Sequence, residues 1–418
     1  MPPRKRPLAA SHAGSAKRPV EISRPPARPP RSKAQQKRSK AVRLGRPPTA
    51  LPLQTLRTLV MERVPWLTLG LSPLQRAAVA AGTEAQHFDM MRLFCLWLLA
   101  TSRKVLEVPG LDLALVDYFQ ALMDEKTPPH VGSKTLASFL HAAPNLGSSL
   151  RTAFPLAHRA LVGWQRLMPA QTRPPVPFLV VVLIVLHLLS EEQIAMALCI
   201  LLMFTSYLRP REATSLRREQ LVPPQIYGGA HFQLWALVLH PLENMQASKC
   251  GQFDESILID SEVFTGVSAG NTTGSGTRAG SSGWISPFLE CLRADGSSKA
   301  LWPFEHVDLI RAVHRATECL GLTHLKVCLY SMRHGGASHD WLISSRSLSE
   351  IKSRGRWSSD SSLRRYQKAA KAQSQLSLVG APLLEVASRA AKQLGDLFHQ
   401  PAIAQVLYQQ ARAAHVRS

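Results

Sequence analysis

The sequence contains few cysteines and no apolar run long enough to cross a membrane. Its six cysteines are scattered and form no C-x-x-C pair. This argues against a zinc ribbon or a disulfide scaffold and is typical of a reducing compartment. The most apolar run, residues 178–189, has 12 residues, and because a membrane span needs about 20, it predicts a buried helix. The N-terminus also lacks the apolar segment of a signal peptide, so we expect a soluble protein with no membrane partner.

A phosphate-binding loop for nucleotides is missing as well. The Gly-, Ser- and Thr-rich segment 268–283 includes G-S-G-T-R-A-G, but no Lys-Ser or Lys-Thr pair follows it. The segment is not flanked by a clear strand and helix either, as such a loop requires. We therefore expect no nucleotide cofactor.

Acidic residues are scarce relative to basic ones. Lys and Arg total 50 against 28 Asp and Glu, which gives a net charge of +22. Residues 1–50 alone hold 14 basic residues and 1 acidic residue, a net charge of +13. A basic chain with a still more basic tail is typical of proteins that bind a polyanion, most often nucleic acid.

This tail, residues 1–50, is rich in Pro, Lys and Arg. It has almost no large apolar side chains whose burial could offset the entropy of ordering, so we expect it to be disordered. Its cluster Arg4-Lys5-Arg6 is typical of a nuclear import signal, of a non-specific nucleic-acid arm, or of both. A nuclear location is therefore expected.

Apolar residues at helical spacing recur in most of the remaining sequence. They do so clearly at 88–100, 116–123 and 134–143, whereas the runs 232–240 and 255–260 are strand-like and predict a β-hairpin. The expected fold is mainly α with a small β-sheet. Its expected parts are the tail at 1–50, a helical bundle at 51–170, a second domain at 171–382 and a C-terminal helical tail at 383–418.

Arg209 lies just after a long apolar helix, in the sequence Tyr207-Leu208-Arg209-Pro210-Arg211-Glu212. Pro210 is well placed as the first residue of a new helix. Arg209 is then expected at a helix N-terminus, where backbone N–H groups and the helix dipole favour anions. Its planar guanidinium suits two phosphate oxygens, and Glu212 can brace it. Taken alone, the pattern more often marks an ordinary salt bridge at a helix start.

Tyr366 lies in a basic stretch among Arg364, Arg365 and Lys368. A free phenol has a pKa of about 10 and is a poor nucleophile at neutral pH. Nearby cations lower that pKa because they favour the phenolate. In isolation, a half-buried tyrosine with its hydroxyl in water remains the simpler interpretation.

Taken together, these residues resemble the phage-integrase-like tyrosine recombinases. In that family an arginine is followed three residues later by Glu, a β-hairpin carries a lysine, and a box has the form H-x-x-R-H. A His or Trp follows a Gly, and the nucleophilic tyrosine comes nine residues later. The matching residues follow the family's order over 158 positions. They are Arg209 with Glu212, then Lys249, then Arg333 with His334, Ala337 and His339, then Trp357 after Gly355, and finally Tyr366.

The resemblance implies site-specific DNA cleavage and rejoining, for recombination or integration by a eukaryotic mobile element. Tyr366 then forms a 3′-phosphotyrosyl bond, and Lys249 protonates the leaving 5′-oxygen. Arg209 and Arg333 clamp the phosphate oxygens, and Trp357 adds an N–H donor. Family members place a helical DNA-clamping domain first and act as tetramers on double-stranded DNA, without ATP or metal. Their C-terminal helix often docks on a neighbouring subunit, so the tail at 383–418 docks either there or on its own domain.

One position departs from the family's pattern. The first position of the H-x-x-R-H box is Tyr330, where the family usually has His or Lys. A tyrosine can donate a hydrogen bond to a phosphate oxygen but is a weaker acid–base partner than histidine, which leaves His334 as a partial substitute. This departure keeps open a DNA-binding protein that kept the fold after losing catalysis. A type IB topoisomerase-like enzyme, which uses the same chemistry, is a second alternative. A basic RNA-binding protein is a third option, although no aromatic-rich RNA-binding motif is present.

Overall fold

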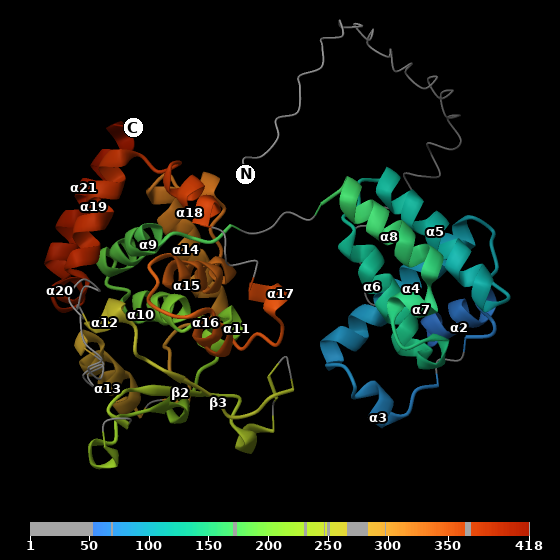
Figure 1. The fold of residues 1–418 in the computed structure, drawn as a ribbon, viewed down its shortest axis with the longest axis horizontal. Helices are drawn as coiled ribbons and strands as arrows, with labels where there is room; N and C mark the ends of the chain where they lie inside the picture. Colours follow the sequence, from blue (N-terminus) through green and yellow to red (C-terminus); the bar gives the residue numbers. More distant parts are fainter. Residues whose placement is uncertain are drawn as a thin grey trace, which may run out of the picture. The chain divides into compact units, whose positions relative to one another are not determined.

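The structure, a computed structural model, describes most of the chain from residue 53 to residue 417. Within that range the described residues exclude 68–69, 170–173, 230–231, 246, 249–250, 266–282, 297 and 364–368. The tail at 1–50 lies outside the described residues, and so do the predicted site residues Lys249 and Tyr366. The chain divides into two compact units, residues 1–171 and 172–418 (Figure 1).

The first unit is helical throughout its described residues. Its α-helices are α2 (Leu53–Arg63), α3 (Pro73–Arg76), α4 (Ala81–Ala100), α5 (Val108–Asp124), α6 (His130–Ala142), α7 (Leu150–Ala153) and α8 (Pro155–Leu167). The helical stretches predicted around 88–100, 116–123 and 134–143 are confirmed in α4, α5 and α6. Aromatic rings fill the core between these helices, where Phe94 meets both Tyr118 and Phe139 edge to face.

The second unit combines helices with a small sheet. Its α-helices are α9 (Phe178–Ser190), α10 (Ile194–Thr205), α11 (Pro210–Thr214), α12 (Glu262–Thr265), α13 (Ser286–Ala294), α14 (His306–Cys319), α15 (Leu329–Leu342), α16 (Leu348–Arg354), α17 (Asp360–Leu363), α18 (Ala369–Leu376), α19 (Ala381–Lys392), α20 (Leu394–His399) and α21 (Pro401–Arg417). Its strands are β1 (Leu221–Val222), β2 (Ala236–Leu239) and β3 (Glu255–Leu258).

Helix α9 is the centre of the second unit. Its residues from Val180 to Leu189 are all buried, as expected of a helix that is apolar on every side. Helices α10, α14, α19 and α21 all pack against it, and Figure 1 shows α19 and α21 beside it. The apolar run at 178–189 is thus a buried helix, as predicted. Among the described residues, no helix is both long and apolar enough to span a membrane.

The three strands form one antiparallel sheet in the order β1-β2-β3. Leu237 pairs with Ile257 across β2 and β3, and both side chains are buried against the helical core. The predicted hairpin is therefore confirmed, but each strand is shorter than its apolar run. Strand β2 ends at Leu239 because the next residue, His240, has a φ of 53°, which leaves the extended region.

The C-terminal helices belong to the core of the second unit. Leu383 and Val386 of α19 and Leu407 and Tyr408 of α21 are buried in the same apolar cluster as α9. In the described residues this segment therefore packs on its own unit. The fold is mainly α with a small sheet, as predicted.

Candidate active site in the second unit

Arg209 stands at the turn between α10 and α11. Pro210 is the first residue of α11, as predicted, and Arg209 is its N-terminal cap residue. The Glu212 carboxylate accepts a hydrogen bond from the Arg209 backbone N–H at 2.8 Å and another from its guanidinium. The expected bracing by Glu212 is therefore present. Because α11 has only five residues, any preference for an anion here depends on the guanidinium and not on a long helix dipole.

Arg333 lies on α15 and is buried, with 1% of the residue exposed. Its guanidinium donates hydrogen bonds to the backbone carbonyls of Tyr207 and Gly355. The guanidinium carbon lies 4.7 Å from the centre of the Trp357 ring. These contacts join the turn that carries Arg209, helix α15, and the segment that follows α16. Arg333 is thus not a surface charge.

Tyr330 and His334 lie one turn apart on α15. Their ring centres are 5.0 Å apart, with the planes tilted by 61°, and both side chains are half-buried. The residue that departs from the family's pattern is therefore in contact with the imidazole expected to substitute for it.

A second arginine shares Glu212 with Arg209. Arg356 donates from Nη2 to the Glu212 carboxylate at 2.5 Å, and its Nε lies 3.4 Å from Glu255 of β3. Burial lowers the pKa of Arg356 to about 10, and the charges of Arg333 and Arg209 act in the same direction. Arg356 therefore lies close to both arginines of the predicted site. Arg356 matches no position of the family's motifs, although it directly precedes Trp357.

The charges around Glu212 nearly balance. Burial acts to raise the pKa of Glu212, but the charge of Arg356 and the hydrogen bonds and charge of Arg209 outweigh it, so this pKa lies below its ordinary value. Among the described residues here, three arginines (209, 333 and 356) face two glutamates (212 and 255), a formal balance of +1. A small positive excess of this kind suits an anionic ligand.

Tyr207 lies two residues before Arg209 and is fully buried. Its hydroxyl donates to Asp340, and Arg346 bridges Asp340 at 3.0 Å and Asp260 at 2.7 Å. Burial and the Asp340 charge raise the pKa of Tyr207. Its ring stacks with Trp357 at a centre-to-centre distance of 6.1 Å. Tyr207 is therefore a protonated, packed support for the site.

The two remaining predicted residues lie outside the described residues, but their neighbours are described. Lys249 belongs to the connection between β2 and β3, where the Gly251 N–H donates to the Ser248 carbonyl at 2.9 Å. Tyr366 belongs to the connection between α17 and α18. Leu363, at the end of α17, is buried in one cluster with Tyr207, against which Trp357 packs. The chain thus enters the segment of Tyr366 from beside Trp357.

A polar groove of about 750 Å³ lies beside Glu212. Its lining includes Arg211, Arg217, His240 and His306, and the His306 Nδ1 lies 3.1 Å from the Thr214 hydroxyl. The His240 Nε2 lies 3.6 Å from the Glu212 carboxylate. A concave surface with several basic side chains therefore continues from the candidate site.

Two comparisons with known proteins give no relative. No protein-family model matches the chain, and no curated protein matches it. Among the described residues, no group of three or more His, Cys, Asp or Glu side chains could hold a metal ion. The function is therefore inferred from the residues of the candidate site and their geometry.

Proposed function

We propose that this chain is a tyrosine recombinase, an enzyme that cleaves and rejoins DNA strands through a 3′-phosphotyrosyl intermediate. Its partner in this proposal is double-stranded DNA, on which four copies assemble in the nucleus. The first unit clamps the DNA and the second carries the chemistry.

The observation that carries the proposal is the convergence of Arg209, Arg333 and Trp357. These residues come from three separate segments, yet Arg333 donates to the carbonyl of Tyr207, two residues before Arg209, and stacks with Trp357. The β2–β3 hairpin reaches the same cluster, because Glu255 contacts Arg356. This arrangement supports a shared site, since charged residues that serve only solubility are not expected to come together from separate segments.

The proposed chemistry needs groups that position a phosphate and neutralise its charge. The Tyr366 oxygen attacks the phosphorus and forms a P–O bond, while the bond to the 5′-oxygen breaks. Lys249 gives that oxygen its proton as general acid, and His334 is the proposed acceptor of the tyrosine proton. The 5′-hydroxyl of a second strand then attacks and releases Tyr366. No net bond energy is lost, so no ATP is needed.

The two clamping arginines differ in how far their side chains are exposed to solvent. Arg209 has 18% of its side chain exposed, so it is the one we expect to meet the phosphate first. Arg333 donates to two backbone carbonyls in the structure. The proposal therefore requires Arg333 to exchange these bonds for phosphate oxygens when DNA binds.

Covalent trapping tests the proposal. The substrate is a pool of nicked duplexes with randomised sequence around the nick, in which the cleaved fragment diffuses away and leaves the protein attached. We expect a covalent adduct with the unmodified protein and with Tyr227→Phe, a fully exposed control tyrosine, but none with Tyr366→Phe. A Tyr366→Phe protein that forms the same adduct would rule out the proposed nucleophile.

A second candidate is a DNA-binding protein that retains the fold without catalysis. Two observations favour it: Tyr330 occupies the usual His or Lys position, and Arg333 is buried with carbonyl partners. This candidate predicts duplex binding with no adduct from any variant, so the trapping experiment separates the two.

A further inference from the structure

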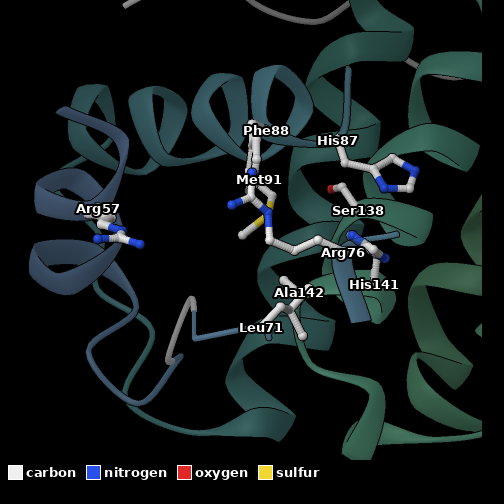
Figure 2. A pocket seen from close by; sticks show the side chains of 9 residues that line it. All are labelled: Arg57, Leu71, Arg76, His87, Phe88, Met91, Ser138, His141 and Ala142. Carbon is white, nitrogen blue, oxygen red and sulfur yellow. The ribbon is translucent and has the colours of Figure 1, made fainter. Parts of the chain in front are cut away.

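The first unit contains a small pocket that has no part in the proposed chemistry. It lies where α2, α3, α4 and α6 approach one another, and Figure 2 shows the side chains around it. Its volume is about 40 Å³. Because one water needs roughly 10–15 Å³ of such space, the pocket has room for about three water-sized atoms. It therefore suits up to three oxygens of a small oxyanion whose remaining atoms lie at the rim, and not a larger ligand. Its lining residues are Arg57, Leu71, Arg76, His87, Phe88, Met91, Ser138, His141 and Ala142.

The polar part of this lining is basic. It includes two arginines and two histidines but no carboxylate. Arg76 is paired with Glu84, at 2.6 and 3.2 Å, while Arg57 is exposed. Figure 2 shows His87 and His141 on one side of the pocket, together with Ser138. The ligand that such a lining favours is an anion.

The two histidines provide an independent sign of a ligand. Their ring centres are 5.1 Å apart, and His87 is only 9% exposed. The His87 Nδ1 and the His141 Nε2 are both buried and have no hydrogen-bond partner among the described residues. Buried polar atoms without partners cost free energy, so an oxygen-rich group that accepts hydrogen bonds from these two nitrogens would remove that cost.

The protonation of His87 also depends on a ligand. Burial lowers the pKa of His87, the charge of His141 lowers it further, and Glu84 opposes both. The neutral imidazole is therefore favoured while no anion compensates its charge. An anion near the rings raises the pKa, so its binding takes up protons and strengthens as the pH falls.

We propose that this pocket binds one phosphate-like oxyanion, held by hydrogen bonds from the ring nitrogens of His87 and His141, with Arg57 and Arg76 at its rim. A free phosphate ion and a phosphate of a nucleic-acid backbone share this chemistry. The proposal does not depend on strand cleavage, because every residue involved belongs to the first unit.

Calorimetric titration of the full chain with inorganic sulfate tests the proposal. Sulfate keeps its charge between pH 5.5 and 7.5, so any pH effect comes from the protein. We expect binding to be about tenfold tighter at pH 5.5 than at pH 7.5. We expect the double variant His87→Asn/His141→Asn to lose this site, while Arg151→Gln, an exposed change in the same unit, keeps it. Equal sulfate binding by the double variant would overturn the proposal.

A second measurement needs no variant and so does not depend on how well one folds. The same titration in two buffers of different ionisation enthalpy counts the protons taken up on binding. Sulfate bound by the Lys and Arg side chains of the tail takes up none, because these side chains do not titrate in this range. We expect net proton uptake at pH 6.5, and no uptake would contradict the pocket.

A final arm separates the two sources of phosphate. A duplex without terminal phosphates is titrated into the protein with and without saturating sulfate at pH 5.5. If the pocket takes a backbone phosphate, the double variant binds this duplex more weakly and sulfate competes with it. If the pocket takes a free ion, duplex affinity is the same in both proteins. The sulfate titration tests the site itself, and once sulfate binding is lost in the double variant, either outcome of this arm identifies the source of the oxyanion.

Discussion

Glu212 is the residue on which the charges of the candidate site depend. Its side chain is 7% exposed and contacts both Arg209 and Arg356. Burial is the main cause of the lowered pKa of Arg356, and the charge of Arg209 acts in the same direction, because two guanidinium groups this close repel each other. One carboxylate therefore holds both guanidinium groups in place, and replacing it affects the whole cluster.

We predict that Glu212→Gln destabilises the protein at pH 7 by about 3–5 kcal/mol, as when one partner of a buried ion pair is removed. The pKa of Glu212 is lowered in the folded state, so its stabilisation is present above the unfolded pKa and is lost as the pH falls through the folded pKa. The difference between the two proteins should therefore shrink below about pH 4.5. Urea unfolding at pH 7, pH 4 and pH 3 measures this, and a difference that does not shrink at all between pH 7 and pH 3 would contradict the ion-pair role.

We expect the rate of the proposed cleavage step to depend on Tyr330. It touches His334 on the same face of α15, where a histidine would serve as a better acid–base partner. We predict that Tyr330→His speeds adduct formation about tenfold or more, since general acid–base groups contribute at least that much. Single-turnover cleavage of the trapped substrate measures the rate, with Tyr227→His as the exposed control. An unchanged rate would mean that the position takes no part in catalysis.

At the scale of elements, glycines allow α15 to approach its neighbours closely. A Cβ on Gly336 would lie 1.8 Å from the Phe204 carbonyl oxygen of α10, and one on Gly335 would lie 2.3 Å from the Val176 carbonyl oxygen. These are backbone atoms, which cannot move aside as a side chain can. The small residues after His334 are thus needed for close packing. This packing fixes the position of Arg333 relative to the α10–α11 turn.

We predict that Gly336→Ala lowers the free energy of unfolding by roughly 1–3 kcal/mol or more, because overpacking forces the helices apart. The control is Gly163→Ala in α8, where a Cβ meets nothing within 4 Å. That change should stabilise slightly, by about 0.4–1 kcal/mol, since alanine restricts the unfolded chain. Thermal and urea unfolding compare the two, and equal stabilities would show that α15 can shift without cost.

Local signals in the sequence predicted the elements well, because their causes are local. Pro210 begins α11, Ser347 caps α16 through Glu350, and Gly355 follows its last residue. Arg356 could not be found in this way. Its partner Glu212 lies 144 positions away, and no short pattern records a contact that only the tertiary fold creates.

At the scale of the whole molecule, charge is distributed unevenly between the tail and the two folded units. Residues 1–50 carry a net charge of +13 out of +22. Each unit has its own apolar core, so the units account for their stability without the tail. The tail's proposed part is to raise the affinity for DNA of any sequence, because contacts with phosphates release counterions.

We predict that deleting residues 1–50 weakens duplex binding most at low salt and makes the salt dependence less steep. If about half of the 14 basic residues of the tail contact phosphates, the slope of log affinity against log salt should become less negative by about 6. Fluorescence anisotropy at several salt concentrations measures the slope. A tail of equal length with every Lys and Arg changed to Gln controls for length and should match the deletion. An unchanged slope after deletion would mean that the folded units supply the phosphate contacts, and then the polar groove beside Glu212 becomes the first surface to test.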